Sequence, residues 1–337
     1  MKKILILMLV IVVGAALLSG CFDNGGDTYT NGYDVNDGDM LLIGIAQIIA
    51  HPALDAAREG FKAGLAEEGF VEGRDVRFRE FNAQGDMGTL ASIATQIVGE
   101  NADLILSIAT PTSQSLSNET DTIPIVITAV TNPLLVGGVE TLERPGANVT
   151  GTSDLTPIAA QFDLMMEILP ETQTVGIMYN AGEVNSVYQA DMAAAAATAL
   201  GLTYVRATVT GTHDIAQVAE ATVRSVDVIY VPTCNTIAAA YATLVTVADA
   251  ANTPVIVGER AGVTEGALAT SGIDYYELGR QTAVMAAQIL RGEANPAEMP
   301  IQWQDADKMT VTINTTTAEQ LGITIPGGIL VGAELVE

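Results

Sequence analysis

The sequence predicts an α/β protein made of two doubly wound parallel-sheet lobes. Short apolar runs alternate with amphipathic helical patterns, which is typical of parallel sheets covered by helices on both faces. This alternation is interrupted at Gly151-Thr-Ser-Asp-Leu-Thr-Pro157 and resumes after it, which indicates a crossing between two similar lobes. Of the 337 residues, 337 − 40 = 297 follow the N-terminal segment, which is more than one ordinary core usually serves.

The N-terminal segment predicts a lipoprotein signal. Lys2 and Lys3 precede an apolar run of 15 residues, Ile4 to Leu18, which is short for a membrane-spanning helix of about 20. Small residues then lead to Cys21. We expect residues 1–20 to be a signal peptide and Cys21 to carry the lipid. A short membrane anchor, or an ordinary signal with a chance cysteine, is the alternative.

Residues 21–40 are predicted to form a flexible acidic tether. They are rich in Gly, Asp and Asn, and such a segment buries too little apolar surface to offset its chain entropy. The expected location is therefore the extracytoplasmic face of the cell membrane, with the lipid as anchor. A net charge of −26 argues against nucleic acid as a partner, because phosphates require a basic face.

The first half of the chain reads as four strands and three helices in alternation. A helix is expected to begin at His51-Pro52, because Pro is favoured in a first turn. Thr110 opens another helix. The expected elements are a strand over 40–46, a helix over 51–69, a strand over 76–81, a helix over 90–98, a strand over 104–108, a helix from 110 and a strand over 123–129.

The second half repeats this alternation until Gly262, where it breaks. An Ala-rich helix ending at Leu200 is expected to be capped by Asn185 or Ser186. The expected helices cover 162–169, 185–200, 213–223, 235–251, 276–290 and 318–321, and the expected strands cover 175–179, 203–207, 226–231, 254–257, 267–271 and 309–313.

Several strings, taken in order, resemble the ABC-transporter substrate-binding proteins of the tryptophan/tyrosine-type family. The resemblance covers roughly residues 41–327. It is carried by His51-Pro-Ala-Leu-Asp55, Asn82-Ala-Gln-Gly-Asp86, Ile108-Ala-Thr-Pro111, Arg144-Pro-Gly-Ala-Asn-Val-Thr-Gly151, Ser153-Asp-Leu-Thr-Pro157, Val231-Pro-Thr233, Gly266-Ala-Leu-Ala-Thr270 and Gly272-Ile-Asp-Tyr-Tyr-Glu-Leu-Gly-Arg-Gln281.

The resemblance implies a type I periplasmic-binding-protein fold, with two lobes joined by three crossings near Ser153, Gly272 and Glu298. Lobe 1 would then comprise residues 41–153 and 274–298, and lobe 2 residues 154–273 and 299–337. We expect a monomer without a cofactor. Such a protein captures an aromatic or other hydrophobic amino acid in the interlobe cleft, closes by a hinge and delivers the ligand to an ABC permease.

The sequence departs from the family pattern at Asn132, at Cys234 and over Gly258–Gly262. All three places lie at expected strand ends near the cleft, so the ligand need not be that of the relatives. Cys234 reads as a small pocket or core residue.

A zwitterionic ligand needs two kinds of partner. Its carboxylate suits helix N-termini with hydroxyl or amide groups, as at Thr110, Asn185 and Ser186, although plain capping explains the same residues. Its ammonium needs a carboxylate, and Asp154 and Asp274 each lie at an expected crossing. Hinge hydrogen bonding or helix capping is the alternative for both acids.

Further candidates for ligand contact follow strand ends. Gln47 and His51 follow the first strand, and Thr128 lies at the end of the fourth. Asn180 and Asn235 follow strands of the second half, where turn formation is the competing explanation.

No enzyme motif is present, and only two histidines occur in the chain. There is no Gly-x-Ser-x-Gly elbow, no Walker loop and no metal-ligand cluster, so neither catalysis nor a metal is expected. Two other functions remain open from the residues alone. A sensory module could present the ligand to a signalling partner, or an acid pair such as Asp154 and Asp274 could serve an extracellular hydrolase.

Overall fold

The structure, a computed structural model, describes residues 40–304 and 309–337. The expected signal peptide, its lipidation residue Cys21 and residues 21–39 of the tether lie outside these ranges. Within the described ranges, no helix is both long enough and apolar enough to cross a membrane.

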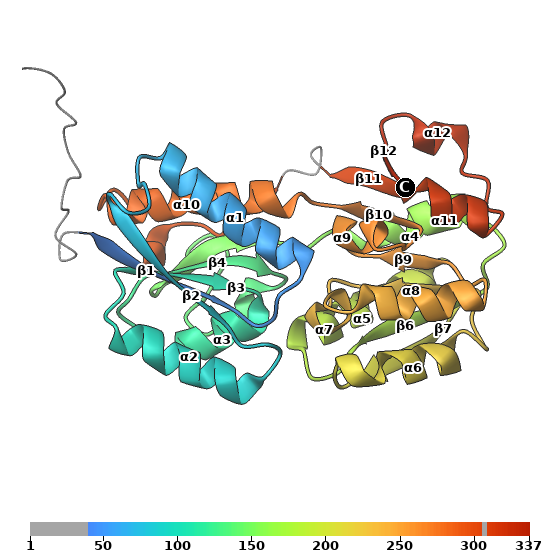
Figure 1. Cartoon of the computed structure of the whole chain (residues 1–337), viewed down its shortest axis with the longest axis horizontal. Helices are drawn as coiled ribbons and strands as arrows, with labels where there is room; N and C mark the ends of the chain where they lie inside the picture. The colour runs from blue at the N-terminus through green and yellow to red at the C-terminus, as the bar shows by residue number, and fades with distance from the viewer. Residues whose placement is uncertain (1–39, 305–308) are drawn as a thin grey trace, which may run out of the picture. The chain divides into compact units, whose positions relative to one another are not determined.

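A five-stranded parallel sheet forms the core of the first lobe, in the order β2-β1-β3-β4-β5 (Figure 1). Its central strands are buried on both faces, which is why they read as continuous apolar runs. The elements are β1 (Leu41–Gln47), α1 (Pro52–Glu67), β2 (Val76–Asn82), α2 (Met87–Gly99), β3 (Leu104–Ile108), α3 (Thr110–Glu119), β4 (Ile125–Val130), η1 (Pro133–Leu135) and β5 (Val149–Ser153).

Helix α10 (Tyr275–Leu290) returns to this lobe and lies along α1 (Figure 1). The two helices pack with their backbones in contact. A Cβ atom added to Gly60 would lie 2.0 Å from the carbonyl oxygen of Tyr276, and one added to Gly279 would lie 2.0 Å from that of Ala57. Only glycine permits this approach, so these glycines set the helix separation.

A seven-stranded sheet forms the second lobe, in the order β12-β11-β10-β9-β8-β6-β7. All neighbours run parallel except β10 and β11, which are antiparallel. The elements are α4 (Ile158–Ile168), β6 (Thr174–Asn180), α5 (Val184–Ala199), β7 (Thr203–Val209), η2 (Thr212–Asp214), α6 (Ile215–Thr222), β8 (Val228–Val231), α7 (Asn235–Ala238), α8 (Tyr241–Ala250), β9 (Val255–Val257), α9 (Arg260–Thr264), β10 (Ala269–Gly272), η3 (Pro296–Glu298, which follows α10 beside β5), β11 (Thr310–Asn314), α11 (Thr315–Gln320), α12 (Gly327–Leu330) and β12 (Glu334–Val336).

The segment after η3 stays with the first lobe longer than the sequence suggested. The carbonyl of Met299 accepts a hydrogen bond from Thr150 Oγ1 at 2.8 Å. Gln302 bonds to Gly151 and Ser153 through its backbone N–H and carbonyl, at 2.9 and 2.7 Å. The expected boundary at residue 299 therefore falls inside a stretch that is hydrogen-bonded beside β5.

Two helix predictions in the second lobe are wrong in detail. The single helix expected over 235–251 is divided into α7 and α8 at Ala240. Glu183 binds the first turn of α7, whereas Tyr241 and Leu244 of α8 are packed in the apolar core, and these separate anchors override the helix propensity of the alanines between them. Glu183 occupies the N-cap position of α5 without a side-chain capping hydrogen bond, so Asn185 and Ser186 both lie in the first turn instead of at the cap.

Candidate functional site

A closed cavity lies between the two lobes, where strands of both sheets reach their carboxyl ends. Parallel α/β sheets bind ligands at this edge. The first lobe contributes residues that follow β1 and β4, and the second contributes residues that follow β6, β8 and β9. The lining residues are His51, Leu54, Ala129 and Thr131 from the first lobe, Asn185, Thr233, Cys234, Asn235, Ala238 and Glu259 from the second, and Asp154 and Tyr275 at the crossings.

Strained backbone supports this edge of the first sheet. Ala109 and Ala129 have φ angles of 78° and 54°, in the left-handed region that residues with a side chain rarely adopt. Ala109 caps α3, and Ala129 lines the cavity. Such strain costs roughly 1–3 kcal/mol at each residue and gathers at binding sites.

The cavity wall carries polar atoms that lack a hydrogen bond of normal geometry. They are both ring nitrogens of His51, Oδ1 of Asp154, Oδ1 of Asn185 and Oε1 of Glu259. Buried polar atoms are paired in the great majority of cases, so five unpaired atoms around one cavity indicate a site made for a polar ligand.

The ionisation of these groups follows from their burial. Burial lowers the pKa of His51 to about 4, so the ring is neutral at pH 7. Burial raises the pKa of Asp154, against the opposing effect of the Tyr275 hydroxyl, which donates to Oδ2 at 2.7 Å. Burial, with a further contribution from the Asp154 charge, raises the pKa of Glu259 to about 8. The wall thus holds two acids, and no Lys or Arg is among the described residues that line it.

Glu183 organises the second-lobe side of the cavity from behind. Its Oε2 accepts hydrogen bonds from the backbone N–H of Asn235 at 3.0 Å and from Asn235 Nδ2 at 2.7 Å. Its Oε1 accepts from Thr236 N at 2.9 Å and from Thr236 Oγ1 at 2.5 Å. This buried carboxylate is satisfied by the protein, and it holds Asn235 in place at the wall.

One side chain joins the lobes directly. Gln189 Nε2, on α5, donates to Thr131 Oγ1 of the first lobe at 3.1 Å and to Thr233 Oγ1 of the second at 2.6 Å. The enclosed volume is only about 10 Å³, which is the space of one water molecule. The described lobes are therefore closed on each other, and a larger ligand requires them to part.

Among the predicted ligand residues, Asp154, Asn185 and Asn235 line the cavity. Thr110, which follows the strained residue Ala109, is buried, and its Oγ1 has no hydrogen-bond partner. It is not among the residues that line the cavity.

Three other predicted ligand residues form hydrogen bonds with protein groups instead. Ser186 donates to Glu183 at 3.2 Å. The side-chain oxygen of Asn180 accepts from Gly182 N at 2.7 Å, which is the turn formation that competed with ligand contact. Thr128 accepts a hydrogen bond from Thr152 at 3.2 Å.

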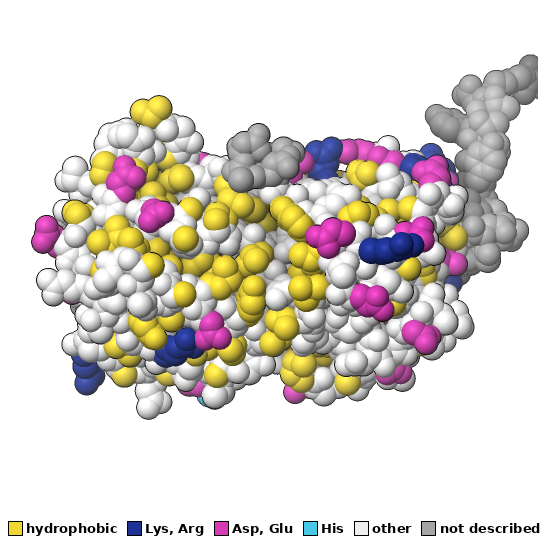
Figure 2. Space-filling model, turned by 180° about the vertical axis from the view of Figure 1, so that it is seen from behind, with side chains coloured by type: hydrophobic (Ala, Val, Ile, Leu, Met, Phe, Trp, Pro, Cys, Tyr) yellow, Lys and Arg dark blue, Asp and Glu magenta, His cyan; other side chains and the backbone are white. Residues whose placement is uncertain are grey.

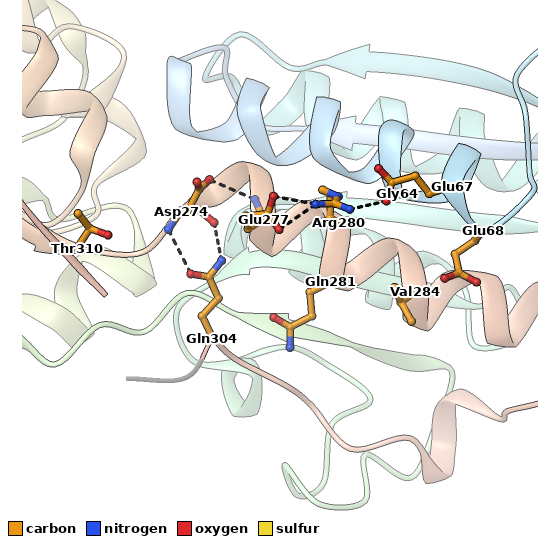
Figure 3. A pocket seen from close by; sticks show the side chains of 10 residues that line it. All are labelled: Gly64, Glu67, Glu68, Asp274, Glu277, Arg280, Gln281, Val284, Gln304 and Thr310. Carbon is orange, nitrogen blue, oxygen red and sulfur yellow. Dashed lines mark hydrogen bonds and ion pairs between the residues drawn. The ribbon is translucent and has the colours of Figure 1, made fainter. Parts of the chain in front are cut away.

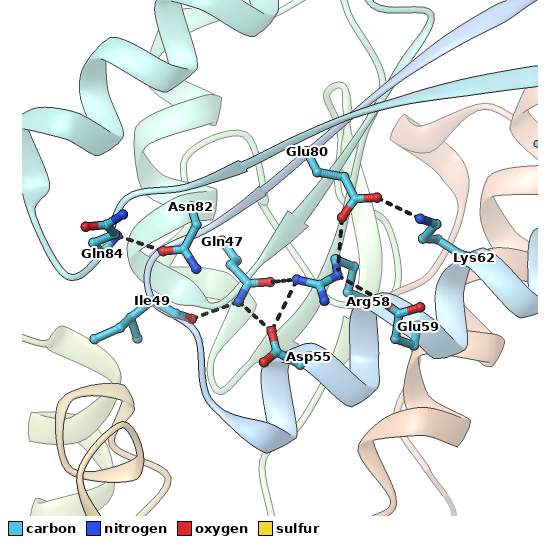
Figure 4. A network of polar contacts seen from close by, with 9 residues as sticks. All are labelled: Gln47, Ile49, Asp55, Arg58, Glu59, Lys62, Glu80, Asn82 and Gln84. Carbon is cyan, nitrogen blue, oxygen red and sulfur yellow. Dashed lines mark hydrogen bonds and ion pairs between the residues drawn. The ribbon is translucent and has the colours of Figure 1, made fainter.

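Gln47 also lies away from the cavity wall. Its amide nitrogen donates to the carbonyl of Ile49 at 2.9 Å and to Asp55 at 3.0 Å, and its oxygen accepts from Arg58 at 3.2 Å (Figure 4). These contacts tie the loop after β1 to α1, so Gln47 shapes the loop that carries His51.

Asp274, which was predicted as a possible partner of the ligand ammonium, is not among the residues that line the cavity. Its side chain is exposed and caps α10 by accepting from Tyr276 N at 2.8 Å and Glu277 N at 3.2 Å. It lines a separate surface pocket of about 490 Å³, together with Glu67 and Arg280 among others (Figure 3). The capping alternative accounts for this residue.

Glu259 is the acidic wall residue that sequence reasoning missed. It follows β9 at once, in the stretch that departs from the family pattern. The signal was available, because an acid directly after a short apolar strand points to the same sheet edge as the other candidates.

The surface carries little that would attract an anionic polymer. On the face drawn in Figure 2, apolar side chains are spread between acidic ones, and most Lys and Arg side chains lie beside an acid. The ion pairs Arg144–Glu298 and Arg206–Asp191, at 2.6 and 2.7 Å, are two examples among the described residues. Within 40–304 and 309–337, no group of His, Cys, Asp and Glu has the arrangement of a metal site.

Comparisons with known proteins agree on one family. Residues 42–337 match the model of the ABC transporter substrate binding protein family. The tyrosine-binding protein of Clostridioides difficile (strain R20291) is 36% identical over 318 residues, which cover 94% of this chain and 92% of that protein. The fold also extends to distant proteins, such as a leucine binding protein of Thermotoga maritima at 14% identity and a TM-score of 0.56.

Two relatives of known structure differ in how well they superimpose on this chain. A domain from Streptococcus pneumoniae in complex with L-Trp is 35% identical, covers 88% of this chain and all of its own, and has a TM-score of 0.85. The ligand-free, open structure of a substrate binding protein from Clostridium difficile is 38% identical, covers 88% of this chain and 99% of its own, and has a TM-score of 0.67. The identities are similar, and this chain superimposes more closely on the complex than on the open form.

The two-lobed α/β fold, the interlobe cavity and the match over residues 42–337 lead to one assignment. The family consists of binding proteins that are not enzymes. This chain belongs to the ABC transporter substrate-binding protein family.

Proposed function

We propose that this protein is a lipid-anchored extracytoplasmic receptor that captures an aromatic amino acid and delivers it to an ABC permease. The observation that carries the proposal is the interlobe cavity, whose unpaired polar atoms come from both lobes and include the carboxyl of Asp154. The ligands named for the two relatives, tyrosine and L-Trp, favour the aromatic class.

In this proposal the ligand ammonium binds the free Oδ1 of Asp154. Tyr275 holds the other oxygen of that carboxyl and so fixes its orientation. Asn235 Nδ2 donates one hydrogen to Glu183 Oε2 at 2.7 Å and has a second N–H for the ligand carboxylate. The unpaired Oδ1 of Asn185 is an acceptor and so adds to the binding of the ammonium. The ring would lie among the apolar wall residues Leu54, Ala129 and Ala238.

Binding would proceed by closure about the crossings. The open form admits the ligand, and contacts from both lobes then favour the closed form. The contact between Gln189 and Thr131 forms only when the lobes approach, so it adds to the closed state. The closed form would be the one that docks on the permease.

The lipid anchor rests on the N-terminal sequence. An h-region of 15 residues followed by Ser19-Gly20-Cys21 supports lipidation, and the polar residues after it support a tether. Cys21→Ser should release the protein from membranes into the soluble fraction of cells that express it. Retention of the variant on membranes would count against the anchor.

A thermal-shift and calorimetric screen of residues 40–337 tests the ligand class. L-tyrosine, L-tryptophan and L-phenylalanine should raise the melting temperature, whereas sugars and nucleosides should not. Stabilisation by another class, with no effect of aromatic amino acids, would refute the aromatic assignment.

A further inference from the structure

Two buried glutamines, Gln161 and Gln304, bind the crossings between the lobes, although neither lines the interlobe cavity. The first crossing is residues 153–157, the second is residues 272–274, and the described part of the third is residues 299–304. Glutamine is mostly exposed in proteins, and a buried amide is held by hydrogen bonds. The partners of these two side chains therefore indicate what they do.

Gln161, on α4, joins the first and second crossings on the side of the second lobe. Its Nε2 donates to Thr156 Oγ1 at 3.0 Å and to the carbonyl of Ser271, which directly precedes the second crossing, at 2.8 Å. A longer contact of 3.4 Å leads to the carbonyl of Gly258. Its Oε1 accepts from the Tyr230 hydroxyl of β8 at 2.5 Å, which fixes the amide from the core of the sheet. One side chain thus binds two crossings at their second-lobe ends.

Gln304 joins the second and third crossings on the side of the first lobe. Its Nε2 donates to the carbonyl of Asp274 at 2.6 Å, and its Oε1 accepts from the backbone N–H of the same residue at 3.2 Å (Figure 3). The amide offers a donor and an acceptor together, so it pairs with this backbone as a neighbouring strand does. The third crossing is in turn tied to the first, because the backbone of Gln302 bonds to Gly151 and Ser153.

Few residues lie between the contacts of the two lobes. In the first crossing only Leu155 lies between Asp154, whose backbone N–H is bonded within the first lobe, and Thr156. In the second crossing only residues 272–273 lie between the positions that the two glutamines bind. These short intervals are where the backbone can turn when the lobes part, because the residues on either side are hydrogen-bonded to one lobe.

We propose that Gln161 and Gln304 are a pair of clamps, one in each lobe, that confine hinge bending to Leu155 and residues 272–273. With both clamps in place, few backbone angles change when the lobes close. Without one of them, more of a crossing is free in the open form, and closure must fix it again at a cost in conformational entropy. The inference concerns the hinge alone, so it goes beyond the proposed function and does not depend on which ligand is bound.

The test removes each clamp by substitution with methionine, which is close to glutamine in length and lacks its amide. Gln304→Met removes the first-lobe clamp. Gln161→Met by itself leaves the buried Tyr230 hydroxyl unpaired, so the second clamp is removed as Gln161→Met with Tyr230→Phe, and Tyr230→Phe alone is the matched control. Gln173→Met, the same change at an exposed residue before β6, is the general control. Urea unfolding of each variant reports on folding.

The first measurement needs no ligand. Spin labels on Thr95→Cys of α2 and Thr246→Cys of α8, both exposed, report the distance between the lobes by pulsed electron paramagnetic resonance. The full chain carries Cys21→Ser for this purpose, and the thiol of Cys234 is buried. The second measurement is calorimetry with three amino acids on the same variants.

Both clamp variants should give a broader distribution of interlobe distances than wild type, and both controls should match wild type. The affinity of the clamp variants for L-tyrosine, L-tryptophan and L-phenylalanine should fall by about 5- to 30-fold, as expected when closure fixes roughly one more residue. Since neither glutamine lines the cavity, the factor should be the same for the three ligands.

Three outcomes would overturn the inference. The first is a distribution as narrow as that of wild type in both clamp variants. The second is equal broadening in Tyr230→Phe or Gln173→Met, because these proteins keep both clamps. The third is a loss of affinity for one amino acid that spares the others, which would make the glutamines act on the ligand. If wild type binds no amino acid, the proposed function fails, and the ligand-free distances still decide whether the clamps exist.

Discussion

Replacing Asp154 by Asn isolates the charge at the first crossing. Asp154 is buried, its Oδ2 accepts a 2.7 Å hydrogen bond from the Tyr275 hydroxyl, and its Oδ1 is unpaired in the cavity. Asparagine has nearly the same shape and still accepts a hydrogen bond from Tyr275. The substitution therefore removes the negative charge and keeps most of the packing.

The expected change in affinity follows from what the substitution removes from the ligand-bound protein and from the ligand-free protein. Truncating one partner of a buried, hydrogen-bonded charge pair costs about 2–5 kcal/mol of binding free energy, which is roughly 30- to several thousand-fold in Kd. The ligand-free closed protein should lose nothing comparable, because burial already disfavours the charged form of Asp154 and raises its pKa. We expect the free energy of unfolding without ligand to stay equal or to increase.

Calorimetry with L-tyrosine and urea unfolding without ligand measure the two quantities on the same preparations. Tyr275→Phe is the control for orientation, because it removes the hydroxyl and leaves the carboxyl; we expect a smaller loss of affinity, about 1.5–3 kcal/mol at most. An Asp154→Asn protein that binds within twofold of wild type would refute the assignment of this carboxyl to the ammonium. A variant that binds poorly because it has unfolded would show itself in the urea transition.

Four further predictions concern stability and reactivity. Because burial raises the pKa of Glu259 from its ordinary 4.5 to about 8, its contribution to ligand-free stability is fully present below about pH 4.5 and is lost as the pH rises to 8. Urea unfolding should therefore show Glu259→Gln gaining on wild type across that window, by at most about 5 kcal/mol at ~1.4 kcal/mol per pKa unit, and a constant difference would contradict the burial of this carboxyl. Burial raises the pKa of the Cys234 thiol to about 12, so an aromatic disulfide reagent at pH 8 should label it only after unfolding, and rapid labelling of the folded protein would contradict its burial. Glu183→Ala leaves the donors of Asn235 and Thr236 unpaired and should lower the free energy of unfolding by about 2–4 kcal/mol in urea titrations, with Glu183→Gln losing less. Gly279→Ala places a methyl group 2.0 Å from the carbonyl of Ala57 and should cost about 1–3 kcal/mol or more, whereas Gly292→Ala, just past α10, meets no atom within 4 Å and should cost only what its φ of +71° imposes.

The alternation of strands and helices was predictable from sequence because the sheets are parallel and buried on both faces. Their strands therefore appear as short apolar runs between polar turns, as in Leu104–Ile108 and Val228–Val231. The division of α7 from α8 was not predictable in this way. It depends on Glu183, which is distant in sequence from the helix that it binds.

The two acids at the crossings show where sequence reasoning ended for the site. In the sequence, Asp154 and Asp274 each lie at an expected crossing between the lobes, and only the structure shows which of them lines the cavity. Asp154 lies on the cavity side of the hinge, whereas Asp274 is turned outwards by the start of α10 and caps it. The direction in which a side chain points at a hinge depends on the exact residue at which the next helix begins. Hydrophobic periodicity does not give helix boundaries to a single residue.

Glu259 illustrates the complementary failure. An acid that follows a strand is exposed in most proteins, whereas Glu259 is only 2% exposed. Its place after β9 indicates the sheet edge, but no local pattern records its burial, because the residues that line the cavity with Glu259 come from distant parts of the chain.

The glycine contact between α1 and α10 also governs when the first lobe can be completed during synthesis. Helix α1 ends at residue 67 and α10 begins at residue 275, so the 207 residues 68–274 lie between them. A ribosome must therefore produce most of the second lobe before the first lobe receives its last helix. Nascent domains usually mature in order from the N-terminus, and here that order is blocked by the chain's own connectivity. The first lobe therefore stays incomplete until α10 has been translated, which is compatible with the export that we propose, because a polypeptide threaded across a membrane must still be unfolded when it passes.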